Sequence, residues 1–419
     1  LDVTKANSYI YNAFNEKKSV IDKTLEKNIS YVNLSSLFEY GTAKFDKKIN
    51  LNKKNKINIS SKYKLEKLEN LVTTIESGSR PTGGVSNITE GILSLGGEHI
   101  GNNGELFLDK LKYVPVSFYN NADKGKIRHN DILVCKDGAL TGKVCTIPNS
   151  FEFEHAMVNE HVFILRANED KILQKYLFTF LFSDIGQSVL KSKITGQAQG
   201  GLNSTNLKDV KIPLMPIDVQ IQLVNEVENI ENKIEVATEK INEYEEKIKS
   251  IISGIRNYST KFSNIATLEY GKALKESSRR KGNYYVTGAN GIIGMHDEYI
   301  VESPCIIVGR KGSAGKVNYF DKNCYPIDTT YYVKPIHDTN MKFLYYQMLQ
   351  MQLEKHIDGI GAPGLNRNKV YDLHIQIPPI EEQNRIVEDI EKYENYINDF
   401  NKQIEELNIL RKTVLEKYL

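Results

Sequence analysis

Two glycine-rich loops carry basic side chains in the same order in the two halves of the chain. Residues 136–143 read KDGALTGK and residues 310–316 read RKGSAGK, and each loop follows a run of strand-forming residues. Glycine lets a backbone take positive φ or approach another molecule closely, and the lysine that ends each loop would face whatever approaches. The repeated pattern indicates contact with phosphates or bases. The alternative for each loop is a hairpin turn with solvated lysines.

A second pair of loops contains Gly-Leu-Asn in both halves. Residues 195–203 read TGQAQGGLN and residues 359–367 read GIGAPGLNR. Gln, Asn and Arg are side chains that read base edges through paired hydrogen bonds, although they are equally common in ordinary turns. The candidate DNA-binding residues are Arg80, Lys136, Lys143, Gln197, Gln199, Asn203, Arg279, Arg280, Arg310, Lys311, Lys316, Asn366 and Arg367.

The catalytic motifs of several common enzyme classes are missing from the sequence. Valine follows the loop lysines where a nucleotide-binding P-loop needs serine or threonine, and there is no HExxH zinc motif. Isoleucines flank Pro378-Pro379, so this pair is not the (Asp/Asn)-Pro-Pro-(Tyr/Phe) tetrapeptide of adenine methylation. His155, Glu160 and His161 are interpreted as core or surface residues rather than metal ligands. We therefore predict a non-catalytic protein with no metal or cofactor of its own, while a nuclease site with loosely spaced carboxylates and lysine stays open.

The Gly-Leu-Asn loops begin a repeat with a constant offset, which pairs Asn203 with Asn366 and Gln220 with Gln383. In each copy a strand-like run stops at prolines, which cannot donate to a β-ladder and which suit the start of a helix. A repeat of this length predicts two copies of one structural unit.

A long helix is expected after the prolines of each copy, at about 218–256 and 381–418. Apolar residues recur four and three positions apart in both helices, which is typical of a coiled coil. Two seams in the same phase predict antiparallel pairing of the helices, and the alternative is that each packs on its own domain. The seam residues are Leu223, Val227, Ile230, Ile234, Ala237, Ile241, Tyr244, Ile248, Ile251 and Ile255, then Ile386, Ile390, Tyr393, Ile397, Phe400, Ile404, Leu407, Arg411, Val414 and Tyr418.

Length and composition indicate a globular protein of several domains. The chain has 419 residues, of which 40% are hydrophobic and 26% charged, and its net charge is +2. Its cysteines lack metal-ligand spacing and are interpreted as reduced thiols. No apolar run approaches the length of a membrane span and no signal-peptide pattern is present. We expect a cytoplasmic protein without membrane association.

This layout resembles the specificity subunit of type I restriction-modification systems. The resemblance rests on the Gly-Leu-Asn, proline and glutamine pattern at 201–220 and 364–383, and on Gly-Lys-Val at 142–144 and 315–317. It covers residues 62–419. The first copy departs from the second at Asp218-Val219, where the second copy has two glutamates.

The resemblance implies an α+β fold in which a pair of long antiparallel coiled-coil helices separates two β-rich target-recognition domains. The implied boundaries are 62–216 and 258–379 for these domains, and 217–257 and 380–419 for the helices. Each domain would read half of a split double-stranded DNA site. The helix pair would set the half-site separation and dock two methyltransferase (M) subunits, with restriction (R) subunits as further partners. S-adenosylmethionine, ATP and Mg²⁺ would belong to those partners.

Residues 1–61 form an arm outside this pattern. SYVNL at 30–34 and FDKKINL at 45–51 resemble the C-terminal tail of an N6-adenine DNA methyltransferase. Because the chain also begins at Leu1 rather than Met, one alternative is the C-terminal specificity part of a fused restriction enzyme and methyltransferase. Another alternative is a coiled-coil scaffold whose β-rich modules bind protein.

The two β-rich regions differ between their shared motifs. Residues 79–131 have no sequence counterpart in residues 272–303, so the two half-sites are expected to differ in sequence. Residues 171–191, where Tyr, Leu and Phe alternate, are expected to form a single helix.

Overall fold

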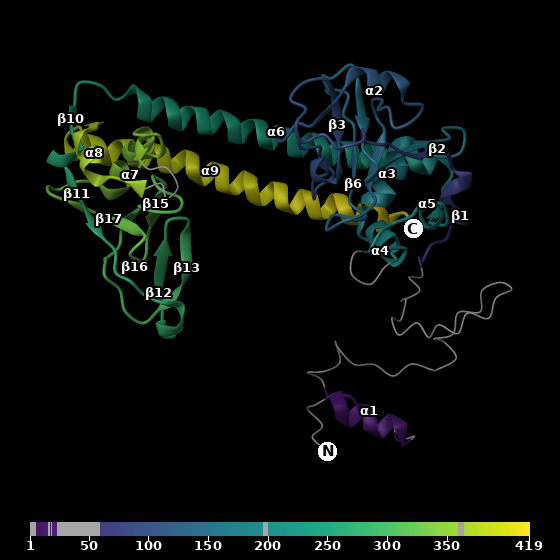
Figure 1. Ribbon diagram of the computed structural model, residues 1–419, viewed down its shortest axis with the longest axis horizontal. Helices are drawn as coiled ribbons and strands as arrows, with labels where there is room; N and C mark the ends of the chain where they lie inside the picture. The colour runs from purple at the N-terminus through teal and green to yellow at the C-terminus, as the bar shows by residue number, and fades with distance from the viewer. Residues whose placement is uncertain (1–5, 16, 18, 23–58, 196–199, 359–363) are drawn as a thin grey trace. The chain divides into compact units, whose positions relative to one another are not determined.

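The computed structural model describes residues 6–15, 17, 19–22, 59–195, 200–358 and 364–419. The chain splits into two compact units, one made of Leu1–Val224 with Leu415–Leu419 and the other of Asn225–Val414. Each unit holds a β-rich domain (Figure 1). The predicted α+β class, with two β-rich domains and long helices, is confirmed. In the described part of the N-terminal arm there is one helix, α1 (Ala6–Phe14).

The first domain is built from small sheets. A four-stranded antiparallel sheet has the order β2-β8-β5-β6, and a three-stranded sheet has the order β4-β3-β7 with β3 and β7 parallel. The short pair β1-β9 joins the start of the domain to its end. The strands are β1 (Leu65–Lys67), β2 (Val72–Ser77), β3 (Ile92–Leu95), β4 (Tyr113–Val114), β5 (Ile132–Cys135), β6 (Val144–Thr146), β7 (Ala156–Val158), β8 (Val162–Ala167) and β9 (Lys211–Pro213).

The second domain repeats these three sheets and also contains the short pair β18-β19. Its four-stranded sheet has the order β11-β17-β14-β15, its three-stranded sheet the order β13-β12-β16 with β12 and β16 parallel, and its short pair is β10-β20. The strands are β10 (Ser259–Lys261), β11 (Ala266–Tyr270), β12 (Tyr284–Gly288), β13 (Gly291–His296), β14 (Cys305–Gly309), β15 (Val317–Phe320), β16 (Cys324–Pro326), β17 (Thr330–Pro335), β18 (Ile357–Asp358), β19 (Gly364–Leu365) and β20 (His374–Gln376).

The duplication therefore extends into the region where the sequence shows none. β3 and β4 lie within residues 79–131, β12 and β13 lie within residues 272–303, and both pairs hold equivalent places in a three-stranded sheet. The lengths of the connections differ: β3 and β4 are separated by a long loop, whereas β12 and β13 form a tight hairpin. Different loops on a shared frame explain why the sequences do not align.

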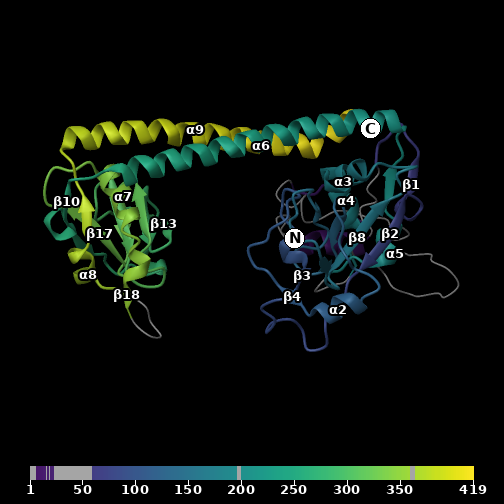
Figure 2. The same ribbon diagram turned by 90° about the horizontal axis from the view of Figure 1, so that it is seen from above.

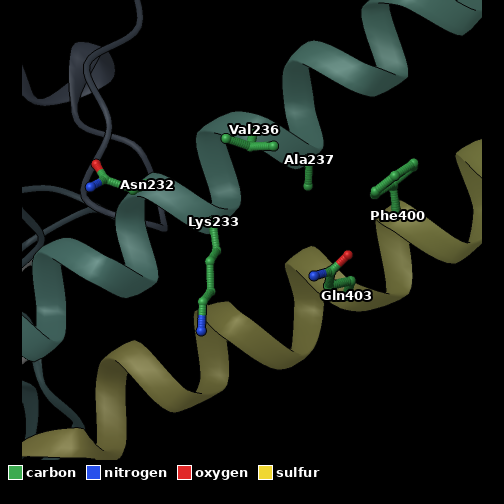
Figure 3. Close-up of a pocket in the computed structure, with 6 residues that line it drawn as sticks. All are labelled: Asn232, Lys233, Val236, Ala237, Phe400 and Gln403. Carbon is green, nitrogen blue, oxygen red and sulfur yellow. The ribbon is translucent and has the colours of Figure 1, made fainter.

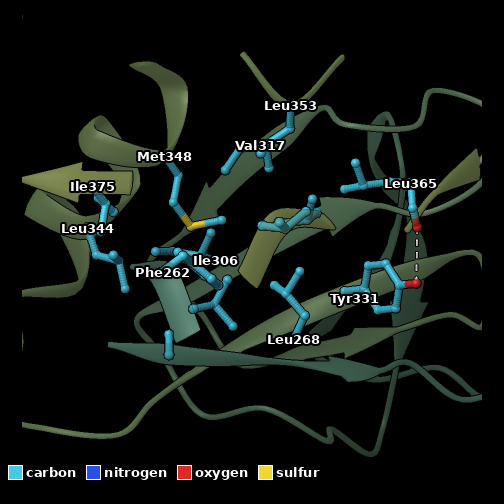
Figure 4. Close-up of a cluster of buried hydrophobic side chains, with 14 of the residues drawn as sticks. Phe262, Leu268, Ile306, Val317, Tyr331, Leu344, Met348, Leu353, Leu365 and Ile375 are labelled. Atoms are coloured by element: carbon cyan, nitrogen blue, oxygen red, sulfur yellow. Dashed lines mark hydrogen bonds between the residues drawn. The ribbon is translucent and has the colours of Figure 1, made fainter. Parts of the chain in front are cut away.

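Each domain has a hydrophobic core of its own. In the first domain Leu93 of β3, Leu133 of β5 and Ile164 of β8 are buried together, so the two larger sheets pack on one another. In the second domain the four-stranded sheet packs on helix α7 through Ile306 and Leu344, among others (Figure 4). Strands β5 and β14 are buried at every position, which explains their uninterrupted apolar sequence.

Short helices connect the strands. In the first domain they are α2 (Val116–Asn121), α3 (Gln174–Phe182), α4 (Asp184–Ser192), α5 (Ser204–Lys208), η2 (Leu68–Asn70) and η3 (Gly97–His99). In the second domain they are α7 (Met341–Gln350), α8 (Arg367–Asp372), η4 (Phe262–Asn264), η5 (Glu276–Ser278) and η6 (Leu353–His356).

The prediction of one helix over residues 171–191 is wrong, because Ser183 divides the segment into α3 and α4. Its backbone is extended, at φ −60° and ψ 159°. Its hydroxyl accepts a hydrogen bond from the Gly186 N–H at 3.1 Å and donates to the Phe180 carbonyl at 2.7 Å. A serine side chain that bonds to the backbone in this way caps the second helix and competes with a continuous one.

The two long helices lie side by side and antiparallel within the second unit (Figures 1 and 2). They are α6 (Ile217–Gly254) and α9 (Ile380–Thr413), which η7 (Val414–Lys417) follows. Their contacts run in opposite directions along the chain: Glu231 meets Arg411, and the Tyr244 and Tyr393 ring centroids are 5.5 Å apart. Every predicted seam position is buried or half-buried. The predicted seams and their antiparallel pairing are therefore confirmed.

The one charged residue in the predicted seams has a partner on the opposite helix. Arg411 Nη1 lies 3.4 Å from Glu231 Oε1, and these side chains are only 12% and 24% exposed. A charge pair inside an apolar seam favours one register of the two helices.

Farther along, small Ala237 faces Phe400 and leaves a pocket of about 230 Å³ (Figure 3). Its other lining residues are Asn232, Lys233, Val236 and Gln403.

The repeated glutamines anchor the long helices to their domains. Gln220 is fully buried, and its Oε1 accepts a hydrogen bond from the Leu173 N–H at 2.9 Å, just before α3. Gln383 is equally buried and accepts from the Asn340 N–H at 3.0 Å, just before α7. Each amide nitrogen also donates to a main-chain carbonyl at 2.8 Å near the prolines. Glutamine is required here because one side chain must both accept and donate.

Replacing either buried glutamine with leucine should destabilise its domain. The Q220L and Q383L variants each leave a helix-start N–H without its acceptor, and we expect a loss of about 1–3 kcal/mol in the free energy of unfolding. Urea unfolding of the full chain measures this loss. Gln222 of α6 is exposed, so Q222L should change stability by less than about 0.5 kcal/mol. Amide hydrogen exchange at Leu173 should accelerate in Q220L alone, and unchanged exchange there would contradict the anchor.

Candidate nucleic-acid interface

In both domains one main-chain hydrogen bond holds the glycine-rich loop against the Gly-Leu-Asn motif. The Leu202 N–H donates to the Lys136 carbonyl at 2.7 Å, and the Leu365 N–H donates to the Arg310 carbonyl at 2.9 Å. These segments are far apart in the sequence. The two pairs of loops found in the sequence therefore form one surface in each domain.

Each glycine-rich loop is the turn of a hairpin, between β5 and β6 in the first domain and between β14 and β15 in the second. The Gly142 N–H donates to the Cys135 carbonyl and the Gly315 N–H to the Gly309 carbonyl, both at 2.8 Å. Gly142 has a φ of +88° and Gly315 of +82°, which other residues rarely adopt. The two loops close in the same way although the second is one residue shorter, and the lysine after each glycine occupies the same place.

Main-chain hydrogen bonds to the neighbouring strand show which residues of the two domains correspond. The Lys136 N–H donates to the His161 carbonyl at 2.8 Å, and the Arg310 N–H donates to the Thr329 carbonyl at 2.9 Å. Lys136 therefore corresponds to Arg310, and His161 corresponds to Thr329. Side chains at these paired positions can be compared directly between the domains.

In the first domain, acidic side chains neutralise part of the surface. His161 Nδ1 lies 2.7 Å from Asp137 Oδ1. Arg80 contacts the other ring nitrogen of His161 and forms an ion pair with Glu160. Lys136 Nζ donates to the Glu160 carbonyl at 3.3 Å. The structure thus brings Arg80 and Lys136 together, and it adds two carboxylates beside them.

In the second domain, two arginines stack on one tyrosine. The guanidinium carbons of Arg310 and Arg367 lie 5.1 and 4.9 Å from the ring centroid of Tyr270, within the range of a cation–π interaction. Arg367 Nη1 also donates to the Leu268 carbonyl at 3.3 Å. Tyr270 is 47% exposed, so this cluster lies at the surface. Neither arginine forms a salt bridge with another described residue.

The three loop lysines lie beside these groups. Lys311 and Lys316 are exposed, and Lys143 is half-buried. In the described part of the chain, none of the three forms a salt bridge. An unpaired ammonium on a flexible stem can turn toward a phosphate without first giving up a carboxylate partner.

The two predicted asparagines cap helices. The Asn203 side chain accepts from the Asn206 N–H at 2.8 Å at the start of α5. The Asn366 side chain accepts from the Asn368 N–H at 3.0 Å at the start of α8. Capping explains why asparagine recurs after Gly-Leu in both copies. Base contact by these two residues stays a prediction.

Arg279 and Arg280 contact the β12–β13 hairpin and the segment after it rather than the two loops. Arg279 Nη1 donates to the Ile293 carbonyl at 2.8 Å. Arg280 pairs with Asp297 at 2.7 Å and Glu298 at 2.6 Å. The Asp297 side chain, as the main cause, raises the pKa of the Arg280 guanidinium. The charge of Arg280 is therefore already offset by two carboxylates.

Gln197 and Gln199 lie outside the described residues. Sequence reasoning missed three side chains at these surfaces: Asp137, His161 and Tyr270. Aligning the two glycine-rich loops would have shown the acidic residue of the first copy. Tyr270 stood in a motif that matches Ile75-Glu76-Ser77-Gly78, and the change from serine to tyrosine there was its signal.

Metal binding, disulfide formation and membrane insertion find no support among the described residues. No group of three or more His, Cys, Asp or Glu side chains there is placed to hold a metal ion. All four cysteines are buried free thiols. No described helix is both long and apolar enough to cross a membrane.

The similarity of this chain to a known protein family extends over both β-rich domains. The family model of the type I restriction modification DNA specificity domain matches residues 12–246 and 259–408. The specificity subunit of the type I restriction enzyme MjaVIII from Methanocaldococcus jannaschii is 22% identical over 151 residues, which are 36% of this chain and 36% of that protein. The match thus spans well under half of the length of this curated relative.

Two solved structures align over most of the chain. One concerns complex assembly and conformational transition of the type I R-M system; it aligns with a TM-score of 0.53 at 14% identity, over 85% of this chain and 97% of that chain. The S subunit of a type I restriction-modification system from M. genitalium aligns with a TM-score of 0.49 at 16% identity, over 87% and 98%. The first of these alignments shows a shared fold.

The family match begins within the N-terminal arm and includes both β-rich domains. It therefore contains both copies of the surface formed by the glycine-rich loop and the Gly-Leu-Asn motif. Because the matched residues make up most of its length, the chain belongs to the type I restriction modification DNA specificity domain family.

Proposed function

We propose that this chain is a sequence-specific DNA-binding specificity subunit that directs a restriction-modification methyltransferase/endonuclease to a bipartite DNA target. The observation that carries the proposal is the duplicated surface: in each domain the same main-chain hydrogen bond holds a basic glycine-rich loop against the Gly-Leu-Asn motif. Two related surfaces in one chain suit two half-sites in one target. Membership of a DNA specificity family supports this role.

Differences between the surfaces favour half-sites of different sequence. Asp137 of the first domain stands where the second domain has Lys311, and His161 stands where it has Thr329. Carboxylates accept hydrogen bonds from the amino group of cytosine, whereas arginine and lysine donate to the guanine acceptors O6 and N7. Equivalent positions therefore suit different base edges in the two domains.

The proposed partners are double-stranded DNA with a split target, two methyltransferase (M) subunits and restriction (R) subunits. The chain itself is non-catalytic in this proposal, and S-adenosylmethionine, ATP and Mg²⁺ act in the partner subunits. The fused methyltransferase alternative finds no support in the comparisons. The protein-binding scaffold alternative differs in a simple way, because a scaffold would not retain DNA.

Removing the loop lysines should weaken binding to DNA of any sequence. We expect K143A and K316A each to lower affinity and to reduce the slope of log K against log [salt] by roughly 0.9 for each phosphate that the variant no longer neutralises. Titrations with a DNA duplex at several salt concentrations measure both quantities. The matched control is K249A, since the Lys249 ammonium is exposed and already pairs with Glu246 at 2.6 Å. Unchanged affinity and slope in both variants would make the loops plain hairpins with solvated lysines.

Changes in the first domain should relax only one half-site. The double variant Q197A/Q199A should reduce discrimination at that half-site by about 1–3 kcal/mol for each base that is no longer read, and it should leave the other half-site unchanged. R367A, in the second domain, should do the reverse. Binding across a DNA library randomised in both half-sites measures each preference separately. If a first-domain change caused equal losses in both half-sites, the proposal that each domain reads its own half-site would be wrong. A single composite site would replace it.

A further inference from the structure

Tyr270 brings together two arginines that come from separate parts of the second domain. It is the last residue of β11, whereas Arg310 follows β14 and Arg367 begins α8. Both guanidinium groups lie about 5 Å from its ring centroid, at 5.1 and 4.9 Å. The Tyr270 ring therefore contacts one arginine of the glycine-rich loop, Arg310, and one arginine directly after the Gly-Leu-Asn motif, Arg367.

The tyrosine ring itself rests on a fixed neighbour. Tyr270 pairs across the sheet with Tyr331, and their ring centroids are 5.1 Å apart. Tyr331 is 3% exposed, and its hydroxyl donates to the Leu365 carbonyl at 3.2 Å (Figure 4). Burial, and then a hydrogen bond with Tyr270, raise the pKa of Tyr331 to about 12, so it stays protonated and able to donate at neutral pH. The platform is therefore tied to the same leucine that holds the loop.

The charged side chains around this platform are mostly basic. Arg310 and Arg367 form no salt bridge with the described residues, and the exposed Lys311 and Lys316 add two more positive charges. Asp328 is an exposed carboxylate next in sequence to Thr329. An exposed cation–π contact contributes only about 0.5–1 kcal/mol. Because both guanidinium groups keep free N–H donors, they can bind a partner that offers hydrogen-bond acceptors.

The first domain has no equivalent pair of arginines on one ring among its described residues, although Lys136 Nζ lies 5.6 Å from the centroid of the Phe163 ring. Ser77 takes the place of Tyr270, since Ser77 pairs with Phe163 as Tyr270 pairs with Tyr331. Arg80, near this place, is held by Glu160 instead of by an aromatic ring. The arginine–tyrosine cluster is thus a property of the second domain alone within the described structure.

A guanidinium group whose orientation is restricted is better suited to recognising a base edge than to attracting phosphates in general. The ring contact restricts both guanidinium groups, and Arg367 is further restricted by its hydrogen bond to the Leu268 carbonyl. A planar fork matches a bidentate acceptor, whereas a lysine acts as a mobile point charge. The neighbouring Lys311 and Lys316 are exposed and can supply phosphate contacts.

We propose, on the basis of the DNA-recognition function proposed above, that Tyr270 is a positioning residue that holds Arg310 and Arg367 to read base edges in the second half-site. The base that fits is guanine, whose O6 and N7 accept a bidentate pair of arginine N–H groups in the major groove. Tyr270 does not itself contact the base. It restricts the two guanidinium groups to the orientation in which they do.

The test compares Y270L with Y270F in the full chain, bound to its methyltransferase subunits, across a DNA library randomised in both half-sites. Y270L should reduce the preference for guanine in the second half-site by roughly 5- to 100-fold, the effect of removing one bidentate pair. The first half-site and the salt dependence should not change. Y270F keeps the ring face and should keep the preference. Y258L is the matched control, because Tyr258 is 38% exposed in the same unit and contacts Glu382 instead of an arginine.

Each other outcome has a distinct meaning. Equal weakening for all sequences with a reduced salt slope would show that the arginines contact phosphates, and an unchanged guanine preference in Y270L would remove Tyr270 from recognition; either result overturns this inference. A wild-type complex without any sequence preference would instead contradict the proposed function. If thermal unfolding shows that Y270L does not fold, R310K decides: it keeps the charge but removes one of the two forks, and it should reduce the guanine preference by a similar factor, whereas an unchanged preference would overturn this inference.

Discussion

The main-chain hydrogen bond from the Gly-Leu-Asn leucine to the first residue of the glycine-rich loop is the contact on which each candidate surface depends. Leu202 makes it to Lys136, and Leu365 makes it to Arg310. Because only main-chain atoms take part, the side chains around it can change while the frame stays in place. This explains how one frame carries paired acidic and basic side chains in one domain and an arginine–tyrosine cluster in the other.

A second pair of contacts joins this frame to the helices. Gln220 and Gln383 each bond the start of a domain helix and the proline segment before a long helix. Both side chains are buried, so water cannot replace these bonds without a loss of stability. The orientation of each long helix at its start is therefore set by the domain that precedes it. Beyond that start, the apolar seam and the Glu231–Arg411 pair fix the register of the two helices.

The two surfaces illustrate how similar geometry can serve different recognition. Positive φ at Gly142 and Gly315 shapes both loops alike, and phosphate contacts from such loops would position the protein without reading sequence. Base readout depends instead on the side chains that surround the loop. At equivalent places these are Asp137 and His161 in one domain, and Lys311 and Thr329 in the other.

Sequence alone determined the features that depend on local pattern or on strict repetition. The 3.5-residue period predicted both seams, because a helix places such residues on one face. The loop motifs predicted one shared surface chemistry, because their glycines and lysines recur in order. These motifs also predicted Arg310 and Arg367 as DNA-binding residues. Family resemblance and fold class followed from the same repeat.

The structure decided two kinds of feature: bonds between a side chain and the nearby backbone that the apolar pattern does not reveal, and contacts between residues far apart in the chain. Ser183 broke an expected helix because its hydroxyl bonds to the backbone on both sides. The two asparagines proved to be helix caps, and Arg80 proved to be paired with Glu160. The change from Ser77 to Tyr270 marked the position in the sequence, but the role of Tyr270 comes from tertiary contacts that set it beside Arg310 and Arg367. Contacts of this kind arise only when the sheet has formed, which is why sequence spacing could not show them.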